Sequence, residues 1–283
     1  MTFNYHASFQ RIFKERAIRM SEIALTSKVV RPDIAVLEVD SARQNALPDR
    51  SVYAMCRSFA MEMEKRNLNY SFLYEKFVSD GRQPINDIPV IFVPNGIVMT
   101  KVLDKKLEDY LRNGGTIIAF APPGVYNEYG KPKADGLLAK TFPGVKWTTG
   151  NYTSWKANGK KQQYWTKKLG KGTLYLFADS MNFDGNCAEF ISIFNKHNKP
   201  VITCSNLNFQ YALREKDGKR YLYLLNYDMD KAQTAEIAVA GKYTVTDISI
   251  PGNQIVKSEY RNGKTIFKVR LAPVEMALFA LSK

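Results

Sequence analysis

The sequence has few of the residues that reactive sites and covalent frameworks need. Its 283 residues include three cysteines and two histidines. Cys56, Cys187 and Cys204 are far apart and odd in number, which argues against a disulfide framework and a paired-cysteine zinc site. We interpret them as small apolar packing residues. His6 and His197 alone leave little for histidine-based acid–base or nucleophilic chemistry.

Long apolar runs are absent as well. No stretch approaches the roughly 18 consecutive apolar residues of a membrane-spanning helix, and the first residues lack the apolar core of a secretion signal. Neither a membrane partner nor a signal peptide is predicted, and the compartment stays open. Hydrophobic residues make up 45% of the chain, which is enough for a packed core.

The charge is strongly one-sided, with a formal net value of +14. A basic surplus attracts nucleic acid when it gathers on one face, but here the lysines are spread along the chain. The densest group surrounds glycine turns at Asn158-Gly159 and Gly170–Gly172, and consists of Lys156, Lys160, Lys161, Lys167, Lys168 and Lys171. We interpret this group as a solvated hairpin and predict no nucleic-acid partner.

Residues 1–32 form the first expected segment. The apolar residues between Ala7 and Ser27 recur at helical spacing, namely Phe9, Ile12, Phe13, Met20, Ile23 and Ala24. Arg31-Pro32 ends the helix, because the residue before a proline avoids the helical conformation. The apolar stripe must pack against the next domain or against a partner.

Residues 33–200 alternate between short apolar strands and amphipathic helices. Thr100 is a candidate N-cap, and Gly114-Gly115 a candidate helix end. Such alternation predicts a doubly wound parallel sheet. The expected strands are 34–39, 70–74, 89–93, 116–120 and 173–178, and the expected helices are 51–66, 100–111 and 187–197.

Residues 201–283 have a different pattern. Asp217-Gly218 and Asn262-Gly263 are two-residue hairpin turns. Phe267, Val269 and Leu271 alternate with charged residues, so one face of that strand is buried. The pattern predicts an antiparallel β-sandwich domain.

A doubly wound sheet binds ligands beyond the carboxyl ends of its strands. Asp40, Asn95 and Asp179 follow three of the expected strands and define a candidate strand-end crevice. The carboxylates show no pairing of the kind that glycoside hydrolysis needs. A hard cation between Asp179 and Asp184 is an alternative that we consider weaker than loop solvation and helix capping.

Other cofactor and nucleophile motifs are missing. The loop after the first strand has no glycine, whereas dinucleotide binding needs a glycine-rich turn. The turn after Phe120 reads Ala121-Pro122-Pro123-Gly124 and offers neither hydroxyl nor thiol. We therefore assign no catalytic residue, no metal and no cofactor.

All three tryptophans fall in one short stretch. Trp147, Trp155 and Trp165 are accompanied by Tyr152 and Tyr164. Indole faces are good platforms for sugars, because they are flat and apolar with a polar edge. Cross-strand aromatic packing in a hairpin explains the same pattern. Trp147, Tyr152, Trp155 and Trp165 are therefore candidate carbohydrate-binding residues, with packing as the alternative.

Several segments resemble a known family. Residues 89–96 read PVIFVPNG, 107–118 read LEDYLRNGGTII and 168–177 read KLGKGTLYLF. These resemble the trimerisation domain of family 42 β-galactosidases, which has a class I glutamine-amidotransferase-like, flavodoxin-like fold. Residues 222–227 (LYLLNY) and 271–276 (LAPVEM) are similar to the small β-domain that ends such enzymes.

The resemblance implies a non-catalytic role. The family's two catalytic glutamates lie on a (β/α) barrel, and no barrel pattern occurs here, so no catalytic residue carries over. The helix of residues 7–27 resembles the last helix of that barrel. The amidotransferase nucleophile would fall near Ala121-Pro122, so that activity is not implied either.

Three functions follow as hypotheses. The first is an accessory and oligomerisation region of a β-galactosidase-like glycoside hydrolase, which associates with itself or with a barrel domain. The second is a stand-alone carbohydrate-binding protein using the tryptophan hairpin. The third is an uncharacterised enzyme at the strand-end crevice.

Overall fold

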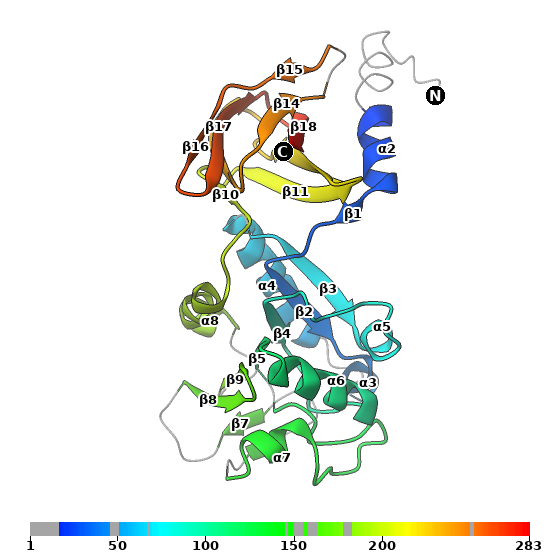
Figure 1. Ribbon diagram of the computed structural model, residues 1–283. Coiled ribbons are helices and arrows are strands. Elements are labelled where there is room, and N and C mark those ends of the chain that lie inside the picture. Colours follow the sequence, from blue (N-terminus) through cyan, green and yellow to red (C-terminus); the bar gives the residue numbers. More distant parts are fainter. Residues whose placement is uncertain are drawn as a thin grey trace, which may run out of the picture. The chain divides into compact units, whose positions relative to one another are not determined.

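The computed structural model describes residues 17–45, 51–66, 68–120, 122–144, 147–149, 155–157, 163–177, 183–249 and 252–283 (Figure 1). The chain divides into two compact units. The α/β unit comprises Pro32–Met63 and Tyr70–Lys199, and the β unit comprises Met1–Arg31, Glu64–Asn69 and Pro200–Lys283.

The α/β unit is built on a six-stranded sheet in the order β3-β2-β4-β5-β9-β8. Parallel pairing joins β3 to β2, β2 to β4, β4 to β5 and β5 to β9, whereas β8 is antiparallel to β9. The strands are β2 (Ile34–Glu38), β3 (Tyr70–Tyr74), β4 (Val90–Val93), β5 (Thr116–Ala119), β8 (Tyr164–Leu169) and β9 (Gly172–Phe177). The predicted parallel sheet is confirmed.

Helices cover both faces of this sheet. Phe59 of α4 and Phe190 of α8 both contact the ring of Phe92 on β4, with 5.1 Å between ring centroids in each case. On the other face, Leu103 and Leu107 of α6 join a core that includes alternate residues of the same strands. The helices are α3 (Asp40–Asn45), α4 (Ser51–Lys65), α5 (Glu75–Ser79), α6 (Lys101–Arg112), α7 (Leu137–Thr141) and α8 (Phe183–His197).

Contacts at the end of α6 explain the spacing of Tyr110, Gly114-Gly115 and Thr116 in the segment LEDYLRNGGTII. The Tyr110 hydroxyl donates to the Ile88 carbonyl (2.9 Å) and accepts from the Thr116 amide (3.2 Å). A Cβ on Gly115 would lie 2.2 Å from the Tyr110 ring, so only glycine fits beneath it. Gly114 has φ +112°, which reverses the chain after the helix. The tyrosine thereby fixes how α6 leads into β5.

The β unit has two antiparallel sheets. One has the order β1-β11-β12-β18-β14-β15 and the other β10-β13-β17-β16. Its strands are β1 (Lys28–Val29), β10 (Ile202–Cys204), β11 (Phe209–Lys216), β12 (Lys219–Asn226), β13 (Gln233–Ala240), β14 (Thr244–Asp247), β15 (Gln254–Ile255), β16 (Ser258–Arg261), β17 (Lys264–Leu271) and β18 (Met276–Ser282). Buried residues from both sheets share one core, among them Leu222, Ile237, Phe267 and Phe279.

Both predicted hairpin turns of this unit are confirmed. Asp217 and Gly218 have φ values of 52° and 72°, and Asn262 and Gly263 have 52° and 76°. Positive φ at both central residues is the geometry that matches the twist of the flanking strands. The first turn joins β11 to β12, and the second joins β16 to β17.

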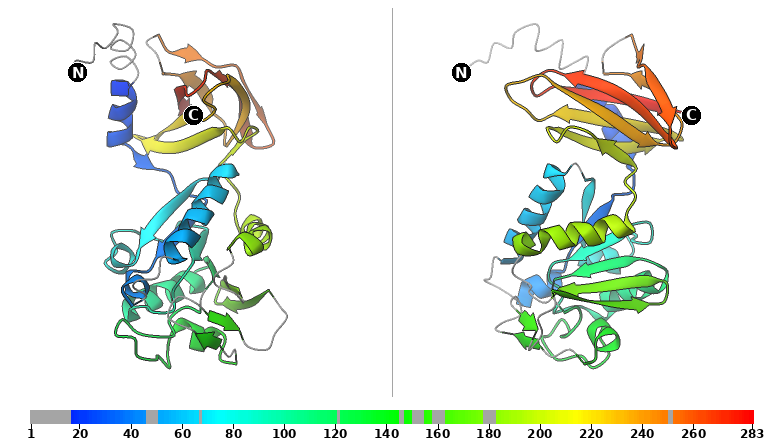
Figure 2. Two further views of the ribbon diagram at one scale, coloured as in Figure 1. Left: turned by 180° about the vertical axis from the view of Figure 1, so that it is seen from behind. Right: turned by 90° about the vertical axis from the view of Figure 1, so that its left-hand side faces the viewer.

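Helix α2 (Ile18–Thr26) packs on the six-stranded sheet of the β unit. Figure 2 (left) shows it in blue beside the yellow strand β11. Met20 and Ile23 contact Ile248 and Leu278 in one apolar cluster. The Arg214 guanidinium donates to the Ala24 and Ser27 carbonyls, both at 2.7 Å. The described half of the predicted apolar stripe thus lies against the chain's own sheet. Its earlier part, with Phe9, Ile12 and Phe13, lies outside the described residues.

Candidate functional site

The strand order places a crevice where ligands bind in open α/β sheets. β3 lies on one side of β2 and β4 on the other, so the chain reverses its direction of winding there. Such a switch point leaves a gap beyond the carboxyl ends of the strands. A crevice of about 770 Å³ occurs at these strand ends. It is lined by Asp40, Ser41, Glu75, Lys76, Ser79, Asp80, Thr100, Lys101, Val102 and Glu128.

Glu75 is the central residue of this crevice. It follows β3 directly and is 4% exposed. One carboxylate oxygen accepts from the Ser41 amide at 2.7 Å. The other accepts from the Thr100 amide at 3.2 Å and from the Thr100 hydroxyl at 3.0 Å. The carboxylate therefore joins the loops that follow β2 and β4.

These contacts place a negative charge at the start of two helices. Ser41 lies in the first turn of α3, and Thr100 is the N-cap of α6, whose hydroxyl also accepts from the Leu103 amide at 3.3 Å. Helix N-termini present amides without partners and carry partial positive charge, so they attract anions. In this crevice the chain supplies the anion itself.

The three predicted crevice residues have different positions. Asp40 begins α3 and lines the crevice. Asn95 is 2% exposed, is not among the lining residues, and accepts from the Ile97 amide at 3.2 Å. Asp179 lies outside the described residues. The structure therefore brings together Asp40, Glu75 and Thr100, and the role of Glu75 was not predicted.

The candidate tryptophans lie in two different parts of the α/β unit. Trp165 on β8 is 8% exposed and belongs to the core of the α/β unit, so its indole presents little surface for a sugar to stack on. Trp147 and Trp155 lie on β6 (Trp147–Thr149) and β7 (Trp155–Ala157), which form a two-stranded antiparallel sheet. Tyr152 lies outside the described residues. Carbohydrate binding at Trp147 and Trp155 stays a prediction.

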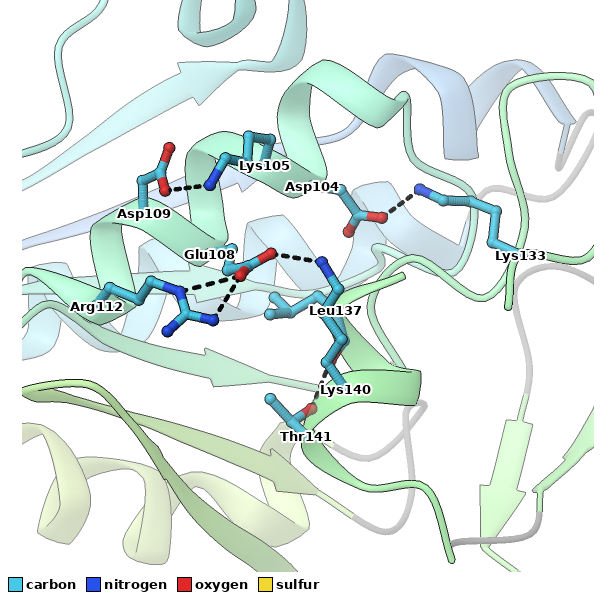
Figure 3. Close-up of polar contacts among 9 residues, drawn as sticks. All are labelled: Asp104, Lys105, Glu108, Asp109, Arg112, Lys133, Leu137, Lys140 and Thr141. Carbon is cyan, nitrogen blue, oxygen red and sulfur yellow. Dashed lines mark hydrogen bonds and ion pairs between the residues drawn. The ribbon is translucent and has the colours of Figure 1, made fainter. Parts of the chain in front are cut away.

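A second charged cluster joins α6 to the segment that follows β5 (Figure 3). Asp104 forms an ion pair with Lys133, and the two side chains are 10% and 9% exposed. Burial raises the pKa of Asp104, and the Lys133 ammonium opposes this rise. A Cβ on Gly124 would lie 2.4 Å from an oxygen of Asp104, so this loop passes directly over the pair. The pair holds the loop on the helix.

Glu108, one turn further along α6, has more exposed partners. It accepts from Lys140 of α7 at 2.7 Å and from Arg112 at 2.8 Å. Hydrogen bonds from Lys140 and then Arg112 lower the pKa of Glu108. The two cations are 44% and 52% exposed, so this network forms an outer clamp on α7.

Cys56, Cys187 and Cys204 all lie in the described part of the chain, and none of them forms a disulfide bond. Burial, with a smaller contribution from Glu38, raises the pKa of Cys56 to about 12, so this thiol stays protonated near neutral pH. Cys187 is buried and Cys204 partly buried. In the part of the chain that the structure describes, no group of three histidine, cysteine or acidic side chains is placed to hold a metal ion. Within the same residues, no helix combines the length and apolar character that a membrane crossing requires.

Solved glycosidases have a similar fold. A β-galactosidase from Bacillus circulans sp. alkalophilus superposes with a TM-score of 0.61 at 14% identity, over 89% of this chain and 41% of that one. Gan42B, a GH42 β-galactosidase from G. stearothermophilus, gives 0.63 at 10% identity, over 90% and 41%. A β-galactosidase from the haloarchaeon Halorubrum lacusprofundi gives 0.52 at 13% identity, over 94% and 42%.

These similarities concern the fold. No family model matches the sequence, and no curated protein sequence matches it either. The chain spans about two fifths of the β-galactosidases that it resembles in structure, with shares of 41%, 41% and 42%. Nearly all of this chain therefore corresponds to one part of GH42 β-galactosidase structures.

Proposed function

We propose that this chain is a non-catalytic accessory and oligomerisation region of a β-galactosidase-like glycoside hydrolase. The observation that carries the proposal is how much of each chain superposes, because 90% of this chain matches only 41% of a GH42 β-galactosidase. A chain built like one part of a larger enzyme is expected to serve that part's role.

The strand order supports an amidotransferase-like fold for the α/β unit. The order β3-β2-β4-β5 corresponds to the 2-1-3-4 winding of flavodoxin-like sheets. The turn after β5 carries Pro122 and Pro123, both buried, where such folds would place a nucleophile. Proline has no backbone N–H and so donates nothing to an oxyanion.

The chemistry of the crevice supports the same proposal. A site that binds an anion at a switch point uses helix N-terminal amides that are open to the ligand. Here the amides of Ser41 and Thr100 already bond to Glu75. The hydrogen bonds that would hold a substrate anion thus stabilise the fold. An enzyme at Asp40, Asn95 and Asp179 remains the weaker alternative, and no observation favours it.

Self-association tests the oligomerisation part of the proposal. Size-exclusion chromatography with light scattering, run over a range of concentrations, is expected to give a mass above the 32.2 kDa of one chain. Addition of the (β/α) barrel of a GH42 enzyme, produced separately, is the second arm. A strictly monomeric chain that also fails to bind the barrel would contradict the proposal.

A further inference from the structure

One end of the β unit exposes several large apolar side chains close together. Three loops meet at this end, and each connects one sheet of the unit to the other: 205–208, 227–232 and 272–275. Single exposed apolar residues are normal, whereas a group of them in one place is typical of an interaction surface. The group, here called the loop patch, consists of Leu207, Tyr227, Met229, Val274 and Met276, which are 41–77% exposed.

Backbone hydrogen bonds hold the loops of the patch together. The Tyr227 amide donates to the Asn208 carbonyl at 2.6 Å, and the Val274 amide donates to the Asp228 carbonyl at 3.1 Å. Val274 has φ +55°, a left-handed conformation that a β-branched residue rarely adopts and that persists only where its surroundings fix it. Glycine adopts this conformation without strain, so the turn itself does not need the valine side chain. The loops therefore form a preorganised surface that displays an apolar side chain.

The charges at the two ends of the β unit are opposite in sign. The three loops of the patch carry three carboxylates, Asp228, Asp230 and Glu275, and one cation, Lys231. The turns at the other end of the same strands, 216–219, 241–243 and 261–264, carry five cations and one carboxylate. These cations, here called the basic end, are exposed or partly exposed and comprise Lys216, Lys219, Lys242, Arg261 and Lys264.

The basic end also offers apolar surface beside its charges. Tyr260 is 53% exposed, and the Lys242 ammonium lies 5.9 Å from the centre of its ring. Lysine stems are apolar along their length and cover apolar surface while their charged ends stay in water. The basic end of one copy therefore complements the loop patch of another in both charge and polarity.

We propose that the loop patch binds the basic end of the β unit of a second copy of this chain, in a head-to-tail contact. Such a contact uses two different surfaces of each copy, so successive copies close into a ring or extend into a filament. The inference rests on the oligomerisation role proposed above and names the surfaces that perform it.

Variants of the two ends test the contact in the full chain, by sedimentation velocity over a range of concentrations. Met229→Ser with Val274→Gly alters the patch, and Lys219→Glu with Lys242→Glu alters the basic end. Each double variant should weaken self-association roughly tenfold or more. The patch variant should keep the melting temperature of the wild type, because glycine relieves the positive φ. Ile255→Ser removes an exposed apolar side chain of β15 outside the patch and should leave association unchanged.

A mixture of the two double variants tests the head-to-tail arrangement itself. The patch variant keeps its basic end, and the basic-end variant keeps its patch. The mixture should therefore form dimers that neither variant forms alone. A mixture that stays monomeric would overturn the head-to-tail contact.

The outcomes also separate this inference from the proposed function. If the wild type and the patch variant associate equally, the inference is wrong and the oligomerisation role stands. If the wild type is monomeric at every concentration, both fail, and binding to the separately produced barrel decides whether the accessory role remains. Loss of barrel binding in the patch variant, with self-association unchanged, would assign the patch to the barrel and overturn the inference.

Discussion

Each unit has a buried polar side chain that bonds to the backbone of neighbouring loops, but the chemistry of the two side chains differs. In the α/β unit the side chain is the Glu75 carboxylate, which only accepts hydrogen bonds. In the β unit it is the Asn226 amide, 0% exposed, which donates to the Lys231 and Ala272 carbonyls at 2.9 and 2.8 Å. Its oxygen accepts from the Asp228 amide at 3.0 Å.

The difference follows from the backbone groups that need a hydrogen-bond partner in each unit. Helix N-termini leave only donors without partners, so a negative acceptor suits them. β loops leave both carbonyls and amides without partners, so a neutral group that donates and accepts suits them. A buried carboxylate in a crevice therefore has a structural explanation here, and needs no catalytic one.

The largest effect is expected at the buried ion pair of the α/β unit. Lys133→Met leaves Asp104 buried without its cation, which should lower the free energy of unfolding by roughly 3–5 kcal/mol. Adding Asp104→Asn removes the uncompensated charge and should restore much of this loss. Urea denaturation of the single and double variants measures both. Equal stability of the wild type and Lys133→Met would show that the pair does not hold the loop.

The pH dependence of Lys133→Met gives a second test of the same pair. The folded-state pKa of Asp104 is raised by burial, and losing Lys133 raises it further. A group whose folded pKa exceeds its unfolded value favours folding as pH falls through the folded pKa. The deficit of Lys133→Met relative to the wild type should therefore shrink in mild acid. A deficit that grows in acid would contradict the assignment.

Glu75→Gln is expected to have the next largest effect. The glutamine keeps the shape but loses the charge and presents two N–H donors, one of them near the amides of Ser41 or Thr100. Hydrogen bonds to charged groups contribute about 1.5–3 kcal/mol each, so a loss of roughly 2–3 kcal/mol is expected. Hydrogen exchange should quicken at the starts of α3 and α6, with β-unit amides as the internal control.

Asn226→Ala tests the corresponding buried side chain of the β unit. It removes one donor group and one acceptor from a site with no exposed surface, and about 1–3 kcal/mol should be lost. Asn226→Asp keeps the shape and acceptor but puts a charge beside carbonyls, and should be worse than Ala at neutral pH. If Asn226→Asp were better tolerated than Ala, the neutral role assigned to this residue would be wrong.

The smallest effect is expected at the outer clamp. Lys140 is 44% exposed, so Lys140→Ala should cost less than about 1 kcal/mol. The pKa of Glu108 is lowered in the fold, so its contribution is present above its unfolded pKa and disappears as pH falls through the folded value. The wild type and Lys140→Ala should therefore converge in acid. A constant difference across pH would point to packing by the lysine stem instead.

Local sequence patterns predicted the strands and the helix cap of the α/β unit. The role of Glu75 was missed because it depends on residues far away in the sequence. The apolar run at 89–93 corresponds to β4 (Val90–Val93), and the Thr100 cap is confirmed. Both features depend on residues that are close together in the sequence. No role was predicted for Glu75 from the sequence, and the structure places it at the start of α5. Its partners Ser41 and Thr100 are 34 and 25 residues away, and no local pattern links them.

Strand β1 was missed for a similar reason. Lys28 and Val29 are both exposed and show no alternation, yet they pair with Glu215 and Arg214 of β11. Trp165 was a candidate sugar-binding residue with aromatic packing as the alternative, and in the structure it pairs with Leu176 of β9 and is buried. The residues that line a crevice or lie on one face of a hairpin depend on such long-range pairings, which no local sequence pattern encodes.

If this chain has no catalytic site of its own, it should not hydrolyse nitrophenyl β-D-galactoside, and the purified chain is assayed together with its Glu75→Gln and Asp40→Asn variants. We expect the chain to produce no nitrophenol above the buffer rate, and neither substitution to change this. Turnover that is present in the wild type and abolished in a folded Glu75→Gln or Asp40→Asn variant would contradict it.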